Sequence, residues 1–346
     1  MPPRHVHLVG SHPAADARQA MIEMAATAGP YLRSLPDGEP GARRNWIAHI
    51  IDGLREHPDV ELRADGDWSG YDDRPVFKVR RGHKLTAASL RTGHAAAAAE
   101  SYGIFKEIRA EQGLDAVSFQ VGIPGDLDLA LFAFGPAAAF TRRRAFRDAL
   151  AREIGEIAGW GGGDVLFQLE VPVELVMVAG APPPLRAATA RLLARGMVAQ
   201  VAAAPAGSRF GVHLCVGDLG NKALRRLNNV APLVAMVRAL LRAWPPGRPL
   251  EYVHVPLAAG DRPPPLDPGF YRGLESLSSI PGDVGFAAGL VHEDQDPDDQ
   301  RRILRVVEGA LSRTVDVSPA CGLGRRSAQA ARQVLERAVI LADCPV

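Results

Sequence analysis

Short apolar runs alternate with longer helical patterns along almost the whole chain. The runs are continuously apolar rather than alternating with polar residues, which is typical of parallel strands covered on both faces. They lie at Val6–Gly10, Ala116–Val121, Val165–Val171, Phe210–Val216, Leu250–Leu257, Val284–Val291 and Thr314–Val317. Repeated strand–helix units over 346 residues predict an α/β fold, a single (β/α)8 barrel, with a doubly wound sheet as the alternative.

Helix-start signals lie between these runs. Asp16 can cap a helix that ends at Gly29, and Asp296 followed by Pro297 predicts the start of another. Residues 30–110 are rich in Gly, Asp and Arg and show one clear helical stretch, at about residues 87–112. We expect this segment to be a loop and helix insertion after the first strand. No linker divides the chain, so residues 1–346 are expected to form one barrel.

Charge and cysteine content exclude several classes of protein. The net charge is +1, so no overall field favours nucleic acid or an anionic membrane. Three cysteines cannot form a disulfide framework and fit a reducing compartment. The first residues lack the apolar core of a signal peptide, and no apolar run reaches the roughly 18 to 20 residues of a membrane span. We therefore expect a cytoplasmic protein without nucleic-acid or membrane partners.

Three side chains suggest a metal site. His213 and Cys215 are two apart on a predicted strand, so they project to the same face. Cys321 follows another predicted strand, and one histidine with two cysteines is a ligand set that suits catalytic zinc. The alternative is a pair of buried cysteines beside a core histidine.

Other candidate residues also lie at the ends of predicted strands or just after them, where a barrel carries its catalytic groups. These residues are Gly10, Ser11, Asp126, Glu170, His254 and His292. Asp126 could instead cap a helix, Ser11 could be a turn residue, and His292 could partner Glu293 and Asp294 at a helix start. Trp46 follows a polar loop and could either line a substrate pocket or pack as a lid over the core.

The order of these motifs resembles the catalytic barrel of cobalamin-independent methionine synthase, within the uroporphyrinogen-decarboxylase-like superfamily. The resemblance is carried by Val9-Gly10-Ser11-His12-Pro13, Gln168-Leu169-Glu170-Val171-Pro172, Gly211-Val212-His213-Leu214-Cys215, Leu290-Val291-His292 and Ser318-Pro319-Ala320-Cys321-Gly322-Leu323. It extends over most of the chain, but residues 30–110 and the region before His254 match poorly. The full-length enzyme has two barrels, and this chain has the length of the catalytic one.

The resemblance implies a zinc ion held by His213, Cys215 and Cys321. Family members add a glutamate from a later strand, and here that strand offers Glu251 or His254. His254 lies nearer the catalytic rim, so we predict His254 as the fourth ligand and leave Glu251 as the alternative.

The implied reaction is alkyl transfer, most simply of a methyl group, to a small-molecule thiol. Glu170 would hold the ammonium group of an amino-acid substrate, and Gly10 and Ser11 would contact its carboxylate. Asp126 and Trp46 are further candidate substrate contacts. The donor could be a methylated pterin or corrinoid, and His292 would then protonate the leaving group.

Three alternative functions stay open from sequence. The same zinc could serve a lyase that cleaves carbon–sulfur bonds, and the sequence does not separate this from transfer. A non-catalytic protein that binds zinc or a corrinoid is a second alternative. A decarboxylase of the superfamily is a third, although it needs no metal and would leave Cys215 and Cys321 without a role. The oligomeric state is not predicted.

Overall fold

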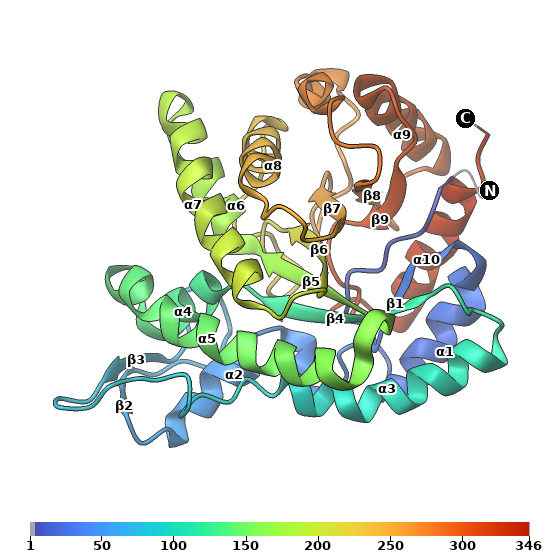
Figure 1. Ribbon diagram of the computed structural model, residues 1–346. Coiled ribbons are helices and arrows are strands. Elements are labelled where there is room, and N and C mark those ends of the chain that lie inside the picture. The colour runs from blue at the N-terminus through green and yellow to red at the C-terminus, as the bar shows by residue number, and fades with distance from the viewer. Residues whose placement is uncertain (1–3, 346) are drawn as a thin grey trace.

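The molecule is organised around one curled parallel sheet with helices packed on its outside (Figure 1). The structure, a computed structural model, describes residues 4–345. The seven strands pair in the order β1-β4-β5-β6-β7-β8-β9. They are β1 (Ser34–Pro36), β4 (Ser118–Pro124), β5 (Val165–Val171), β6 (Arg209–Leu214), β7 (Leu250–Pro256), β8 (Gly285–Val291) and β9 (Asp316–Pro319).

The N-terminal segment lies between the two edges of this sheet. Val6 forms a parallel bridge to Leu32, just before β1, and another to Val317 of β9. The curled sheet is therefore consistent with a TIM-like barrel. The predicted strand Val6–Gly10 is wrong as a full strand, because only Val6 pairs in this way. The other six predicted strands are present, and their bounds shift by at most a few residues.

Helices surround the sheet. They are α1 (Ala17–Ala28), α2 (Ala48–Gly53), α3 (His94–Glu111), α4 (Asp126–Phe134), α5 (Pro136–Gly161), α6 (Pro172–Gly180), α7 (Pro183–Ala203), α8 (Ala231–Ala243), α9 (Pro297–Leu311) and α10 (Ala328–Ala342). The two predicted caps are confirmed, because Asp16 accepts from the Gln19 N–H and Asp296 accepts from the Asp298 N–H. None of the helices in residues 4–345 combines the length and apolar character needed to cross a membrane.

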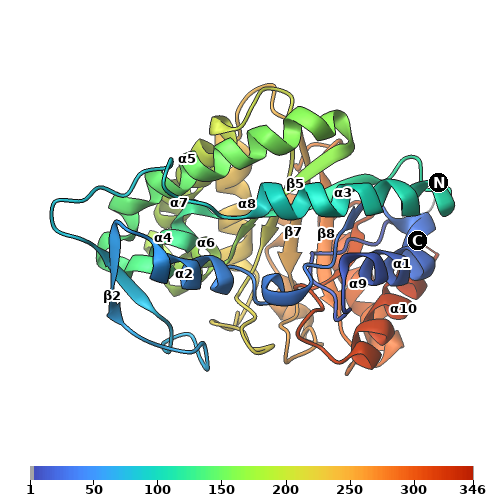
Figure 2. The ribbon, with the colours of Figure 1, turned by 90° about the horizontal axis from the view of Figure 1, so that it is seen from below.

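Residues 30–110 contain more regular structure than loops and one helix. β1 belongs to the central sheet, where its three residues pair with β4. β2 (Val60–Ala64) and β3 (Val76–Val79) form an antiparallel hairpin that extends from the side of the molecule (Figure 2). The prediction missed these strands because β1 is very short and because most hairpin residues are exposed or half-buried, so neither forms a long apolar run.

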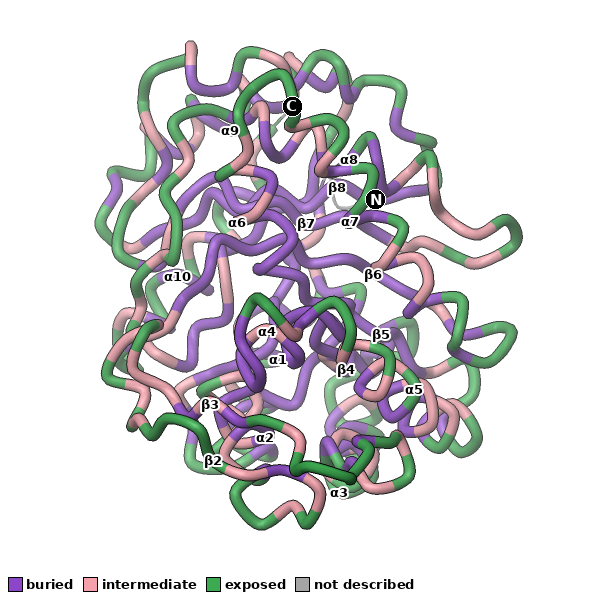
Figure 3. Tube along the Cα trace, turned by 90° about the vertical axis from the view of Figure 1, so that its left-hand side faces the viewer, coloured by how far each residue is buried: buried purple, intermediate pink, exposed green. Residues whose placement is uncertain are grey.

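Burial follows this layering. The strands run through the buried centre, and the exposed positions lie on the surrounding helices and loops (Figure 3). Polar side chains are nevertheless buried where the strands end, among them Gln168, Glu170, His213 and His254. Since a buried polar group needs a partner, the contacts of these side chains define the site.

Candidate metal centre

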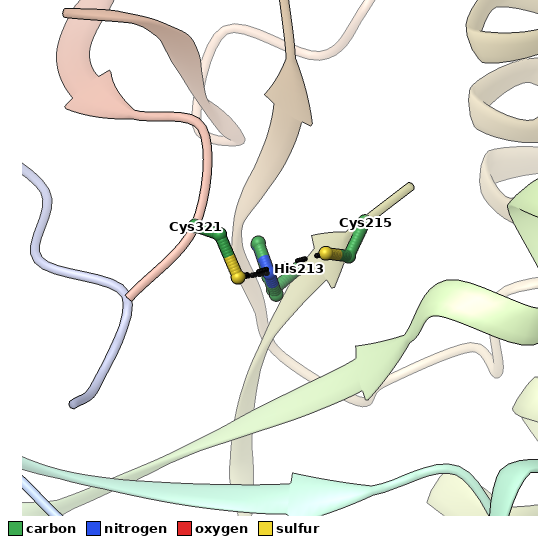
Figure 4. Close-up of side chains that lie close together, drawn as sticks. All are labelled: His213, Cys215 and Cys321. Atoms are coloured by element: carbon green, nitrogen blue, oxygen red, sulfur yellow. Dashed lines mark hydrogen bonds between the residues drawn. The ribbon is translucent and has the colours of Figure 1, made fainter. Parts of the chain in front are cut away.

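His213, Cys215 and Cys321 lie together at the carboxyl ends of the strands (Figure 4). His213 is on β6, Cys215 follows the end of that strand, and Cys321 follows β9. The two Sγ atoms are 3.6 Å apart, and Cys321 Sγ is 3.9 Å from His213 Nε2. All three candidate ligand atoms lie within 4.8 Å of one another, and all three could hold a metal ion. In the described part of the chain this is the one such group of His, Cys, Asp and Glu side chains.

The spacing agrees with tetrahedral zinc. Zinc–sulfur bonds of about 2.3 Å and zinc–nitrogen bonds of about 2.0 Å place two tetrahedral sulfur ligands about 3.8 Å apart, and a sulfur and a nitrogen ligand about 3.5 Å apart. The 3.6 and 3.9 Å separations are close to these values. Three protein ligands also leave one position open, which is the arrangement of catalytic rather than structural zinc. The donor set therefore fits zinc.

A backbone donor and a side-chain donor contact the two sulfur atoms. The Gly217 N–H donates to Cys215 Sγ at 3.3 Å, and Arg325 Nη2 lies 3.6 Å from Cys321 Sγ. In the absence of metal, the hydrogen bond with Cys215, together with burial, raises the pKa of Cys321. A cation at this position would remove that penalty, because thiolates are the form that binds metal.

His254 contacts His213 rather than facing the two cysteines. The two histidines are paired in register across β6 and β7, and their Nδ1 atoms are 2.7 Å apart. His254 Nε2 lies 3.0 Å from the carbonyl oxygen of Pro319, which can only accept, so this nitrogen carries a proton. Burial lowers the pKa of His254 to about 3, so the ring is neutral and its Nδ1 is an acceptor.

This hydrogen-bond chain determines the tautomer of His213. Because His254 accepts at Nδ1, His213 must donate from its own Nδ1. His213 Nε2 then has a free lone pair on the side of Cys321. Burial, and next the neighbouring His254, lower the pKa of His213 well below its usual value, so the ring stays neutral and can bind a metal.

The predicted fourth ligand requires a correction. Both ring nitrogens of His254 have partners within the protein, so the structure does not bring His254 into the group of His213, Cys215 and Cys321. Glu251 does not replace it, since it starts β7 at the other end of the strand and accepts a hydrogen bond from Arg209 Nε at 2.8 Å.

Glu39 and Glu170 form a carboxyl pair. This pair lies beside His213, Cys215 and Cys321, which together are called the metal group. Glu170 is paired in register with His213 across β5 and β6, so it lies one strand spacing from the ligand. A Cβ atom on Gly122 would lie 2.7 Å from Glu170 Oε1 and 3.2 Å from Glu39 Oε1, so both carboxyl groups lie over this glycine. Burial raises the pKa of Glu170 to about 7. Burial, and then repulsion by Glu170, raise the pKa of Glu39 well above its usual value.

The metal group and the carboxyl pair open into one cavity of about 770 Å³, measured with its open mouth. Of the sequence-predicted substrate contacts, Gly10, Ser11, Glu170 and Trp46 line this cavity. Ser11 also fixes the loop that carries Cys321. Its carbonyl oxygen accepts from the Leu323 N–H at 2.7 Å, and its Oγ accepts from the Gly324 N–H at 3.2 Å.

Two predicted residues lie elsewhere. His292 is 1% exposed and does not line the cavity. Its Nε2 contacts the Gly260 carbonyl oxygen at 3.2 Å, and its Nδ1 accepts from the Asp294 N–H at 3.1 Å. These contacts agree with the helix-start interpretation and not with a general acid. Asp126 is also fully buried, starts α4, and accepts from Arg143 Nε at 2.9 Å outside the cavity.

Among the cavity-wall residues that sequence reasoning did not select are Glu39, Arg325 and Tyr71. The residues around Glu39, Asp37-Gly38-Glu39-Pro40, predict a turn, but a predicted turn does not indicate the direction of the Glu39 side chain. Arg325 lies four residues after Cys321 and donates through Nε and Nη2 to Asp218 Oδ2. Tyr71 comes from the loop between β2 and β3, and its hydroxyl accepts from the Leu219 N–H at 2.8 Å. No local pattern predicts this last contact.

No known protein family and no curated protein matches the sequence. The structure is similar to a vitamin-B12-independent methionine synthase from Shewanella sp. W3-18-1 in complex with selenomethionine, with 15% identity, a TM-score of 0.57, and coverage of 94% of this chain and 86% of that chain. A provisionally named vitamin-B12-independent methionine synthase from Listeria monocytogenes gives 16% identity, a TM-score of 0.52 and the same coverage.

A methyltransferase from Methanosarcina mazei aligns over 99% of this chain and 94% of that chain, with 12% identity and a TM-score of 0.58. At these identities the similarity shows the fold. The resemblance inferred from the motifs is therefore confirmed at the level of the fold, which this chain shares with vitamin-B12-independent methionine synthases and a methyltransferase.

Proposed function

We propose that the protein is a zinc-dependent methyltransferase that acts on the thiol of a small molecule. The observation that carries this proposal is the group of His213, Cys215 and Cys321, which opens into a cavity of about 770 Å³. Its three side chains match the number of protein ligands in catalytic zinc sites. A zinc ion bound there would lower the pKa of an incoming thiol and keep its sulfur in the nucleophilic thiolate form.

The residues around the group have separate tasks in this proposal. His254 holds His213 in the tautomer whose Nε2 can bind the metal. Arg325 and the Gly217 N–H donate toward the two thiolates and limit their negative charge. Glu170, with a pKa of about 7, can accept the proton that a thiol releases at neutral pH. Its Oε1 accepts from Gln168 Nε2 at 2.9 Å, which fixes the direction of the carboxyl group.

The acceptor would lie between the metal group and the carboxyl pair. An amino-acid thiol could place its ammonium group against Glu170 and Glu39, with its carboxylate near the backbone of Gly10 and Ser11. This placement is supported by the cavity, which brings these four residues to one wall. Methylated pterins and corrinoids are the donors that the motif resemblance implies.

Metal content tests the proposal most directly. We expect about one equivalent of zinc in protein purified without added metal, and none in Cys321→Ser or Cys215→Ser. Cys344→Ser is the matched control, because Cys344 lies near the C-terminus outside the site and should leave zinc content unchanged. Equal zinc content in all four proteins would overturn the metal site.

Activity then separates transfer from cleavage. Zinc-loaded protein incubated with a thiol and an isotopically labelled methyl donor should yield a labelled thioether, detected by mass spectrometry. Release of a thiol from a thioether without transfer would instead support a carbon–sulfur lyase. The Cys321→Ser protein serves as the inactive control.

A further inference from the structure

The hairpin of β2 and β3, distant in sequence from the metal group, reaches the turn that follows Cys215. Tyr71 lies in the loop between the two strands, and its hydroxyl group makes two hydrogen bonds with this turn. It accepts from the Leu219 N–H at 2.8 Å and donates to the Lys222 carbonyl oxygen at 3.1 Å. Leu219 and Lys222 pair with each other in an antiparallel bridge, so one hydroxyl group bonds both ends of the turn.

Gly217 connects this turn to the metal group. Its N–H donates to Cys215 Sγ at 3.3 Å, and its φ of 86° lies in the left-handed region that favours glycine. A Cβ atom on Gly217 would lie 2.5 Å from the Tyr71 hydroxyl oxygen, which is closer than real side chains allow. The Tyr71 hydroxyl group therefore packs directly against the residue that donates to the Cys215 sulfur.

The same hydroxyl group lies near both candidate ligand sulfurs. Tyr71, Cys215 and Cys321 line one cavity. A phenol keeps its proton at neutral pH, so the hydroxyl group of Tyr71 can donate to the Lys222 carbonyl oxygen. Burial raises the pKa of Tyr71 above its usual value, and negative charge on the two cysteines would raise it further. Tyr71 is therefore a hydrogen-bonding group of the turn and not a proton donor to the substrate.

The hairpin has anchors of its own that do not involve this turn. The Trp68 indole nitrogen donates to Asp52 Oδ2 of α2 at 3.2 Å, and Trp68 stacks on Phe132 of α4 with ring centroids 6.2 Å apart. Arg74 lies over the same Phe132 ring and donates to the Phe132 carbonyl oxygen at 3.3 Å. Within residues 4–345, the hydrogen bonds of Tyr71 are the ones that join the hairpin to the turn. Tyr71 thus connects the turn to two helices.

We propose, building on the zinc site of the function above, that Tyr71 is a positioning residue of the metal centre. Its hydroxyl group holds the turn after Cys215 so that the Gly217 N–H stays directed at the Cys215 sulfur. A bound acceptor thiolate would add a third anionic sulfur to those of Cys215 and Cys321, so their negative charge would exceed the charge of Zn²⁺. An N–H that donates to a ligand sulfur offsets part of this excess, so the turn helps the protein to retain its metal.

A second anchor keeps the turn in place when Tyr71 is changed. Asp218, the residue after Gly217, accepts from Arg325 Nε at 2.9 Å and from Arg325 Nη2 at 2.7 Å. The Lys222 N–H also donates to the Leu219 carbonyl oxygen at 3.1 Å within the turn. Loss of the Tyr71 hydroxyl group should therefore shift the turn without unfolding the protein. An effect on metal binding can then be separated from an effect on stability.

Tyr71→Phe tests this role, because it removes the hydroxyl group and keeps the ring. Tyr102→Phe is the matched control, since the Tyr102 hydroxyl group donates to Asp164 Oδ2 at 2.9 Å and Tyr102, on α3, does not line the cavity. Zinc dissociation constants would be measured by competition with a chromophoric chelator. We expect Tyr71→Phe to weaken zinc binding by about 10-fold, and Tyr102→Phe to bind zinc like the wild type.

Cobalt provides a readout that a loss of stability alone would not change. Co²⁺ bound by cysteine sulfur absorbs light through charge transfer, and hydrogen bonds to the sulfur change the energy of this absorption band. We expect the band to shift in Tyr71→Phe and to keep its wild-type position in Tyr102→Phe. Gly217→Ala should shift it as well, because the added Cβ atom would displace the Tyr71 hydroxyl group. Melting temperatures would be measured for every protein.

The outcomes separate this inference from the function on which it rests. Wild-type zinc affinity and an unshifted cobalt band in Tyr71→Phe would overturn the positioning role, whether or not the melting temperature falls. Equal losses of affinity in Tyr71→Phe and Tyr102→Phe would assign the effect to general destabilisation and also overturn it. A wild-type protein that binds neither zinc nor cobalt would overturn the zinc chemistry itself, and this inference with it.

Discussion

The ends of β5 and β6 and the segment of residues 34–46 line the same cavity, but they position their side chains in different ways. On the strands, Glu170 and His213 are neighbours because the sheet is in register, and their backbone is regular. In the N-terminal segment, Glu39 and Trp46 both have positive φ values, 47° and 55°, which non-glycine residues rarely adopt. The first region depends on strand pairing, whereas the second must be held in place by contacts with the rest of the molecule.

Arg325 is the side chain that most directly joins the two regions. It binds Asp218 after β6, contacts Cys321, and donates from Nη1 to the Arg44 carbonyl oxygen at 2.7 Å. We expect Arg325→Met to lower the free energy of unfolding by about 3–5 kcal/mol, because Asp218 would stay buried without its partner. Urea denaturation measures this change.

Two further variants test this explanation. Arg225→Met removes an exposed arginine and should change stability by less than about 0.5 kcal/mol. Arg325→Met combined with Asp218→Leu should recover part of the loss, because the unpaired charge is then gone. If the double variant were as unstable as the sum of the two single variants, the ion pair would not be what couples the regions.

The carboxyl pair also spans both regions and should make stability depend on pH. The Glu170 pKa rises from 4.5 to about 7 on folding, so between these values the folded state binds more protons than the unfolded state. Stability therefore falls as pH rises from about 4.5 to about 7, by up to about 3 kcal/mol for this group. Glu170→Gln should remove this part of the slope.

The measurement is the free energy of unfolding of metal-free protein at pH 5 and pH 8. The wild type should lose stability between the two values, and Glu170→Gln should lose less. Glu251→Gln, at the opposite end of β7, is the control that should retain the wild-type slope. An equal slope in all three proteins would mean that Glu170 does not titrate against Glu39.

The histidine pair tests the strand region alone. We expect His254→Ala to weaken zinc binding by about 10- to 100-fold, because His213 would lose the acceptor that fixes its tautomer. Glu251→Ala changes the same strand outside the site and should leave the affinity unchanged. Competition with a chromophoric chelator gives both values. A larger loss of zinc affinity in Glu251→Ala than in His254→Ala would indicate that the metal binds near the start of β7, away from His213.

The sequence predicts the strand ends of this site better than the segment of residues 34–46. The spacing of His213 and Cys215, with Cys321 after a distant strand, predicted that these three side chains lie together, because alternation along a strand decides which side chains share a face. The residues of a strand do not determine which strand lies beside it. His254 was therefore predicted at the correct end of its strand but as a metal ligand, whereas in the structure it contacts His213 on the neighbouring strand.

Glu39 and Tyr71 could not be placed for a different reason. Their positions depend on irregular backbone, on a three-residue strand and on a hairpin loop that reaches Leu219, about 150 residues later in the chain. Neither periodicity nor composition records such contacts. Loop residues are positioned by the rigid scaffold beneath them, so their positions can be predicted only once the arrangement of the sheet and its helices is known.

His292 shows that a polar residue at a strand end need not face the cavity, and its variant should have the smallest effect. The ring bonds to the backbone of Gly260 and Asp294, on loops outside the cavity wall. We expect His292→Gln to lower the free energy of unfolding by about 1 kcal/mol, through the weaker geometry of these two bonds, and to keep full zinc content. Turnover at saturating substrate should equal that of the wild type. A large fall in turnover with unchanged stability and metal would return His292 to the role of general acid, and it would require a donor whose leaving group must be protonated.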